Sequence, residues 1–122
     1  MDQIRKRELK EQYKQMKPQM GIFVVRSKAN KKCYIQATKD LRGVINGTKV
    51  RLNAGMHSNL ELRKEWNESG SDNFVIEILE LLDYDQDESK TDYTEDLALL
   101  QMIWEEKLLK DDFQFYRKRG HF

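Results

Sequence analysis

The sequence of 122 residues predicts one small α+β domain, in which helices flank an antiparallel sheet. Two observations carry this prediction. Residues 21–38 show the β-branched and aromatic alternation of a hairpin, and the segments that follow have helical periodicity. Hydrophobic residues make up 39% of the chain and charged residues 35%, which is typical of a folded domain with a well-solvated surface.

The charge balance and the cysteine content limit the classes of function. The 22 basic and 21 acidic side chains give a net charge of +1, which does not favour tight, nonspecific binding to nucleic acid. Cys33 is the single cysteine, so an internal disulfide and a zinc site of paired thiolates are excluded. The first ten residues have no apolar core, and no apolar run approaches the about 20 residues of a membrane span. A cytoplasmic location without a membrane partner is expected.

The N-terminal part, residues 1–19, is predicted to be a highly charged helix over residues 2–17. Its thin apolar stripe consists of Ile4, Leu9, Tyr13 and Met16. Pro18 ends the helix, because its ring clashes with the preceding turn and it lacks an N–H donor. Such a stripe buries little surface by itself, so the helix is expected to pack on the domain, on a protein partner or on a second copy.

The hairpin consists of the strands "GIFVVRS" and "CYIQAT", joined by the polar stretch "KANKK". Because side chains alternate along a strand, Ile22 and Phe23 point to opposite faces of the sheet. On the second strand Tyr34 and Gln36 share one face, while Cys33 lies on the other.

Helical patterns follow the hairpin. Asp40 is a plausible N-cap for a helix over residues 40–54, and Ser58 with Glu61 forms a capping box for a second helix that ends at Gly70.

A third strand is predicted over residues 73–82, and a last helix over residues 94–109. Residues 83–96 form an acidic segment that would repel a phosphate backbone nearby, so a nucleic-acid-binding face must lie away from it. Residues 111–122 read as a basic aromatic tail.

This order of elements resembles that of the GIY-YIG endonuclease family. "GIF" at 21–23 stands where the family has Gly-Ile-Tyr, and "YIQ" at 34–36 stands where it has Tyr-Ile-Gly. The resemblance covers about residues 20–110. It implies a three-stranded antiparallel sheet flanked by helices, to which this chain adds the charged N-terminal helix.

The resemblance also implies a chemistry, the cleavage of a phosphodiester bond. Two motif tyrosines lie near the attacking water, an arginine of the first core helix contacts the phosphate, and a glutamate of the last helix holds a divalent ion. In this sequence Phe23 replaces the first tyrosine and lacks a hydroxyl group. Tyr34 is retained, either as a site tyrosine or as a core residue. Gln36 replaces the glycine, and its side chain would fill the site.

The counterparts of the charged family residues are neutral here. Counted without gaps, the arginine position falls on Val44, a further polar position falls on Thr48, and the glutamate position falls near Gln101. A carboxamide supplies no negative charge for Mg²⁺. The sequence therefore predicts a vestigial site (Phe23, Tyr34, Gln36, Val44, Thr48 and Gln101) without a metal or another cofactor. Mg²⁺ would be needed only by an active enzyme.

Basic and histidine side chains on or near the two middle helices are candidates for nucleic-acid contact: Arg42, Lys49, Arg51, His57, Arg63 and Lys64. Arg51 lies two turns beyond Val44 on about the same face, so it is the best candidate to replace the missing arginine. Alternatively, these side chains and the interspersed glutamates form a mixed-charge, solvated surface. His57 could be a general base or an exposed loop histidine.

Three functions remain open. The first is a nuclease-like domain that has lost phosphodiesterase activity and binds nucleic acid or protein. The second is a divergent, active metal-dependent endonuclease that uses Arg51, His57 and Tyr34 with a carboxylate from Glu77, Glu95 or Glu105. The third is an interaction or oligomerisation protein that uses residues 2–17.

Overall fold

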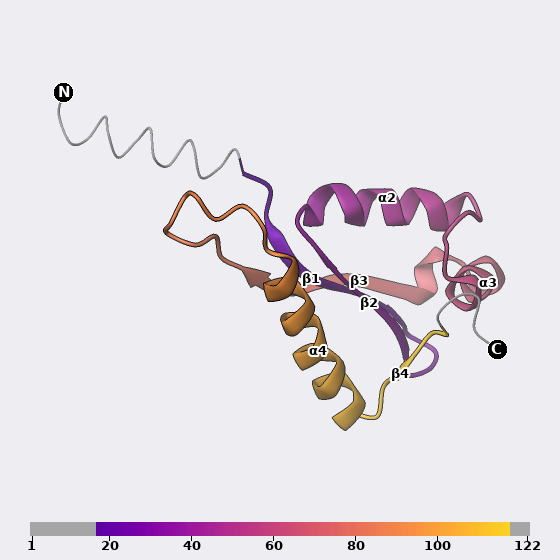
Figure 1. Ribbon diagram of the computed structural model, residues 1–122. Helices are drawn as coiled ribbons and strands as arrows, with labels where there is room; N and C mark the ends of the chain where they lie inside the picture. The colour runs from indigo at the N-terminus through magenta and orange to yellow at the C-terminus, as the bar shows by residue number, and fades with distance from the viewer. Residues whose placement is uncertain (1–16, 118–122) are drawn as a thin grey trace.

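The computed structural model describes residues 17–117, which form a four-stranded sheet with helices on both faces (Figure 1). In chain order the elements are β1 (Met20–Ser27), β2 (Lys32–Thr38), α2 (Leu41–Asn53), α3 (Leu60–Ser69), a 3-10 turn η1 (Ser71–Asn73), β3 (Phe74–Leu82), α4 (Thr94–Lys110) and β4 (Gln114–Phe115). The predicted N-terminal helix lies outside the described residues. Among residues 17–117, no helix combines the length and apolar character needed to cross a bilayer.

The sheet has the strand order β3-β1-β2-β4, with the predicted hairpin at its centre. β1 runs antiparallel to both β2 and β3, and Phe23 lies opposite Gln36 on one side and Ile78 on the other. Gly21 lies so close to β3 that a Cβ atom there would collide with the carbonyl oxygen of Glu80. The glycine of "GIF" is therefore needed for the approach of the two strands.

The fourth strand corrects the prediction of a three-stranded sheet. β4 pairs with β2 in parallel, with Cys33 opposite Phe115. Phe115 packs on the α4 side of the sheet, whereas the next residue, Tyr116, is buried on the α2 side. The chain after α4 thus crosses the edge of β2. A two-residue strand is too short to show a period in the sequence, so no pattern predicted it.

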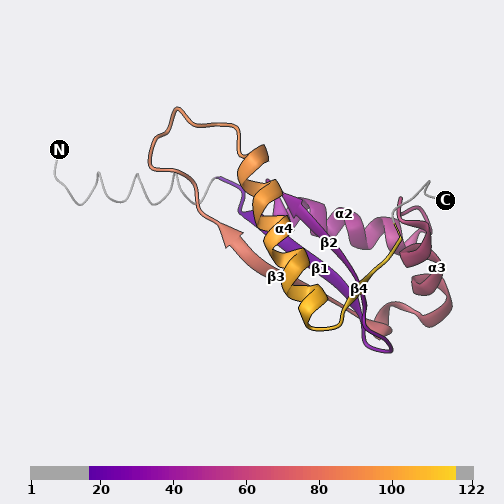
Figure 2. The ribbon, with the colours of Figure 1, turned by 60° about the horizontal axis from the view of Figure 1, so that its bottom comes forward.

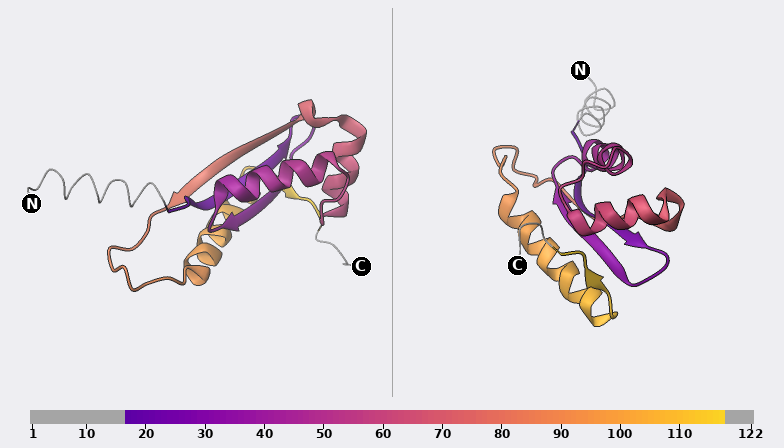
Figure 3. Two further views of the ribbon diagram at one scale, coloured as in Figure 1. Left: turned by 90° about the horizontal axis from the view of Figure 1, so that it is seen from above. Right: turned by 90° about the vertical axis from the view of Figure 1, so that its right-hand side faces the viewer.

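α2 and α3 cover one face of the sheet and α4 covers the other (Figures 2 and 3). Each face carries its own cluster of buried side chains. The cluster under α2 and α3 consists of Phe23, Val25, Leu41, Leu52, Leu62, Trp66, Phe74 and Tyr116. The cluster under α4 consists of Ile22, Val24, Cys33, Ile35 and Leu108. The alternation predicted for both hairpin strands is confirmed.

Capping side chains determine where α2 and α3 begin. Asp40 caps α2 as predicted, since its carboxylate accepts a hydrogen bond of 3.1 Å from the N–H of Gly43. The cap of α3 is Asn59, whose Oδ1 accepts from the N–H of Leu62 at 3.0 Å. The prediction of Ser58 as the cap was therefore one residue early. Gly70, at φ +86°, ends α3 as predicted.

Candidate functional site

The two motif segments present Phe23, Tyr34 and Gln36 on the sheet face that α2 and α3 cover. Phe23 has no exposed surface and belongs to the core, as its missing hydroxyl group suggests. The half-buried hydroxyl of Tyr34 donates a hydrogen bond of 3.0 Å to Oε1 of Gln36. Gln36 thus lies on the same face as Tyr34, as predicted, and the two side chains satisfy each other.

α2 contributes the positions at which the resemblance implies charged or polar groups. Val44 is half-buried and packs against the cluster that contains Phe23. Thr48 is fully buried, and its hydroxyl has no hydrogen-bond partner among residues 17–117. Arg51, in the last turn, is exposed, and its guanidinium lies close to Gly47 of the preceding turn.

His57 lies against Tyr34, and the prediction of an exposed loop histidine is wrong. Its ring is 2% exposed and meets the Tyr34 ring edge-on, with 5.0 Å between the ring centroids and 88° between the planes. Nδ1 accepts a hydrogen bond of 3.0 Å from the N–H of Asn59. In the neutral ring this bond assigns the proton to Nε2, so the ring offers a donor and no free lone pair for a general base.

Arg51 and Arg63 determine the electrostatics around this pair. Burial lowers the pKa of His57 from 6.5, and the charges of Arg51 and Arg63 lower it further. Burial raises the pKa of Tyr34, while Arg51 opposes that shift. The imidazole and the phenol are therefore both uncharged near neutral pH, and the charge of this group comes from two guanidinium groups.

The remaining basic candidates lie apart from this group. Arg42, Lys49 and Lys64 are exposed side chains of α2 and α3. Within residues 17–117, no hydrogen bond or ion pair connects them to Tyr34 or His57.

Gln101 approaches the same region of β2 from α4, on the opposite face of the sheet. Its Oε1 accepts a hydrogen bond of 3.1 Å from the N–H of Ala37. β4 covers only Lys32 and Cys33, so this donor belongs to the part of the β2 edge that no strand covers. Nε2 of Gln101 lies 3.5 Å from Oε2 of Glu105, one turn further along α4. The predicted inward orientation of Gln101 is confirmed, and its oxygen already accepts a hydrogen bond.

Two solved structures with a similar arrangement are endonuclease catalytic domains. The catalytic domain of the homing endonuclease I-TevI superposes with a TM-score of 0.62 and 22% sequence identity, over 81% of this chain and 99% of that domain. A mutant of the catalytic domain of the intron endonuclease I-TevI gives a TM-score of 0.63 at 22% identity, over 81% of this chain and 92% of the other. This chain has a GIY-YIG-like fold. No protein-family model matches the sequence, and neither does any curated protein.

The side chains on this GIY-YIG-like fold do not fit the divalent ion that the resemblance implies. Mg²⁺ prefers carboxylate oxygens, and Gln101 offers a neutral oxygen that is already hydrogen-bonded. Glu77 pairs with Arg26 at 2.8 Å, and Glu95 is exposed in the first turn of α4. Among the described residues, no three His, Cys, Asp or Glu side chains gather in a group that could hold a metal.

Two residues that help to build this region of the GIY-YIG-like fold were not predicted from the sequence. Asn59 holds His57 through its backbone N–H, and a backbone donor leaves no signal in the residue type. Tyr116 joins the cluster beside Tyr34 because β4 brings the chain over the sheet edge. The aromatic character of the tail was the one available signal for Tyr116.

Proposed function

We propose that this GIY-YIG-like domain has lost phosphodiesterase activity and serves as a nucleic-acid-binding module. The supporting observation is that neutral side chains occupy two positions at which the resemblance implies charged ones. Where a phosphate-binding arginine is implied, Val44 packs on the core, and where a metal-binding glutamate is implied, Gln101 binds the backbone of Ala37.

Neutral groups at these positions remove the main electrostatic contributions to cleavage. A single preorganised group that stabilises transition-state charge is worth about 3 kcal/mol in a typical enzyme, and a metal contributes several more. Tyr34 does not compensate, because burial raises its pKa and its hydroxyl already donates to Gln36. A phenol in this state is a poor base for activating water.

Arg51 and Arg63 support the binding part of the proposal. Arg51 lies near both Tyr34 and His57, and Arg63 lies near His57, on the α2–α3 face, where their guanidinium groups can pair with phosphate oxygens. The acidic segment lies beside the first turn of α4, toward the opposite end of the molecule from α3 (Figure 1). A phosphate backbone on this part of the α2–α3 face would thus avoid the repulsive carboxylates.

A cleavage assay tests the loss of activity. Purified protein with supercoiled plasmid and Mg²⁺ or Mn²⁺ should give no more nicked product than the same mixture with a chelator. Nicking that a chelator stops and that Tyr34→Phe abolishes would overturn the proposal. The double variant Val44→Arg with Gln101→Glu restores both implied charges, and gain of Mn²⁺ binding in calorimetry would show that the lost groups account for the lost chemistry.

Binding is tested separately by fluorescence anisotropy with duplex DNA and with single-stranded DNA over a range of salt concentrations. Arg51→Gln and Arg63→Gln should each weaken binding, and each lost phosphate contact should reduce the logarithmic salt slope by about 0.9 on duplex DNA. Lys110→Gln on α4 removes the same charge on the other side of the sheet and serves as the control. Equal losses for all three variants, or binding that depends on none of them, would contradict this interface.

One observation favours a second candidate, the divergent metal-dependent endonuclease. The rings of Tyr34 and His57 are in contact and Arg51 lies near enough to shift the pKa of both, while Glu105 lies beside Gln101 on the α4 side of β2. In that case Glu105→Gln would abolish chelator-sensitive nicking, whereas Glu95→Gln, an exposed carboxylate of the same helix, would leave it unchanged.

A further inference from the structure

The outer face of α4, which points away from the sheet, carries four exposed apolar side chains. Leu99 is 59% exposed, Met102 61%, Ile103 40% and Leu109 56%. At about 100° per residue, the four fall within an arc of about 120° around the helix. The opposite face of α4 already packs on the sheet. A surface helix normally pairs one apolar face with a polar one, so this second apolar stripe indicates a contact surface.

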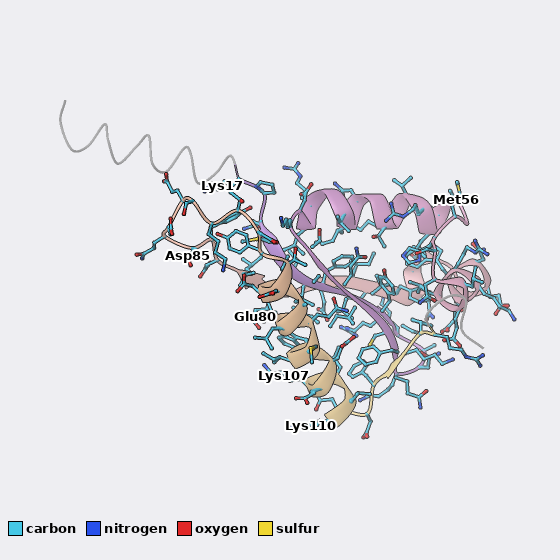
Figure 4. The ribbon with its side chains drawn as sticks, viewed as in Figure 1. Lys17, Met56, Glu80, Asp85, Lys107 and Lys110 are labelled. Atoms are coloured by element: carbon cyan, nitrogen blue, oxygen red, sulfur yellow. The ribbon has the colours of Figure 1, made fainter. Side chains whose placement is uncertain are left out.

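Charge is distributed unevenly along the same helix. Glu95 and Asp96 lie in its first turn, and Lys107 and Lys110 lie in its last. Figure 4 shows Lys107 and Lys110 at one end of α4, and Asp85, in the acidic segment that precedes the first turn, toward the other end. The outer face of α4 therefore has an acidic end, an apolar middle and a basic end.

We infer that this outer face of α4 binds the same face of a second copy of the chain, with the two helices antiparallel. This goes beyond the proposed function and does not depend on it. An antiparallel pair sets the acidic first turn of each helix beside the basic last turn of the other, whereas a parallel pair would set like charges together. The face is thus complementary to itself, as a two-fold symmetric contact requires.

A two-fold axis between Met102 and Ile103 gives a register that matches both the apolar and the charged groups. Met102 of each chain then lies beside Met102 of the other near the axis, and the two Ile103 side chains meet in the same way. Glu95 lies level with Lys110 of the second copy. Both side chains are exposed, and neither has an ion-pair partner among residues 17–117. Two such pairs would flank the apolar centre and fix its register.

Glu106 is an exposed charged residue in the middle of the stripe. In this register it lies level with Leu99 of the second copy. It also lies one turn before Lys110 of its own helix, at the i,i+4 spacing at which opposite charges pair. Lys110 can therefore serve both Glu106 and Glu95 of the second copy, which leaves no carboxylate of the stripe without a cation nearby.

The size of the contact sets its expected strength. α4 has 17 residues and is about 26 Å long, and it offers four exposed apolar side chains to the contact. Such an interface is at the small end of specific protein contacts, so we expect a dissociation constant on the order of 10 μM.

Sedimentation equilibrium of the full chain tests the association, over concentrations from about 1 to about 100 μM. Met102→Glu sets two carboxylates face to face near the axis and should raise the dissociation constant at least about tenfold. Met56→Glu is the matched control and should leave it unchanged, because Met56 is 71% exposed between α2 and α3, away from α4 (Figure 4). A native chain that stays monomeric throughout this range would overturn the proposal, and so would equal effects of the two substitutions.

Single cysteines test the register and the direction of the helices. The two Met102 positions lie at the same level, whereas the two Leu109 positions lie about 20 Å apart along the antiparallel pair. Met102→Cys and Leu109→Cys are matched variants because the native side chains are 61% and 56% exposed. Cys33 is fully buried and is present in both. Mild oxidation should give several-fold more disulfide-linked dimer for Met102→Cys, and equal yields would overturn the antiparallel contact.

Discussion

The two faces of the sheet bury different kinds of side chain. On the α4 face, the buried side chains of β1 and β2 are apolar, such as Ile22, Val24 and Ile35. The α2–α3 face combines an apolar cluster with buried polar groups, among them Thr48 and His57. Burying a polar group costs free energy unless it is fully hydrogen-bonded. The buried polar groups of the α2–α3 face therefore lower the stability, and the buried apolar side chains of the α4 face do not.

Packing alone accounts for the buried side chains of the α4 face, whereas it does not account for the buried polar groups of the α2–α3 face. Stability alone would favour apolar side chains at the positions of Thr48 and His57, as on the α4 face. Buried polar groups that cost stability are expected where a surface is kept for contact with a ligand. The comparison therefore supports the placement of the proposed binding site on the α2–α3 face.

The largest effect is expected from the core of the α2–α3 face. Phe23→Ala removes a fully buried ring and should lower the free energy of unfolding by about 3–5 kcal/mol, because the cavity can relax only in part. Val50→Ala, at a position that is 67% exposed on α2, should change it by less than about 0.5 kcal/mol. Urea unfolding measures both. A loss below about 1 kcal/mol for Phe23→Ala would show that this face is loosely packed.

The next effect is a pH dependence of the unfolding free energy, which arises at His57 on the α2–α3 face. Burial and two arginines hold the folded-state pKa of His57 below 6.5, so between these values the folded state binds fewer protons than the unfolded state. The stability is then fully present above about pH 6.5 and is lost as the pH falls through the folded-state pKa, with a slope of at most about 1.4 kcal/mol per pH unit.

His57→Gln removes this titration and serves as the test. Unfolding free energies measured from pH 7.5 to pH 5 should fall more steeply for the native chain than for the variant. His121→Gln provides the matched control, because it removes the other histidine of the sequence. Parallel curves for the native chain and His57→Gln would show that the ring is as easily protonated in the folded state as in the unfolded state.

The sequence predicted the two faces but not all that lies on them. Alternation alone assigned Ile22 and Phe23 to opposite faces, because a strand has a period of two whatever its neighbours are. The burial of His57 could not be predicted in this way, since it depends on the Tyr34 ring, which comes from another segment of the chain. The hydrogen bond from the backbone N–H of Asn59 leaves no signal in the residue type either. β4 was missed for a related reason: its pairing partner, β2, is distant in the chain.

A smaller effect of opposite sign is expected at Thr48. Its buried hydroxyl has no partner among the described residues, so the folded state bears the cost of removing it from water. Thr48→Val keeps the shape of the side chain and should raise the free energy of unfolding by about 1 kcal/mol. Thr94→Val, at an exposed hydroxyl in the first turn of α4 that donates to Asp92, should lower it slightly. A loss of stability in Thr48→Val would reveal a partner for the buried hydroxyl.

The smallest effect concerns a hydroxyl on the same face that does have a partner. Tyr34→Phe removes the donor of the 3.0 Å bond to Gln36 and leaves the contact between the two rings in place. Because Gln36 is only half-buried, water can replace the lost donor, and the free energy of unfolding should fall by about 0.5 kcal/mol. The opposite signs expected for Tyr34→Phe and Thr48→Val follow from hydrogen bonding alone. If both variants were more stable than the native chain, the Tyr34–Gln36 bond would contribute nothing, and Gln36 would be free to contact a ligand.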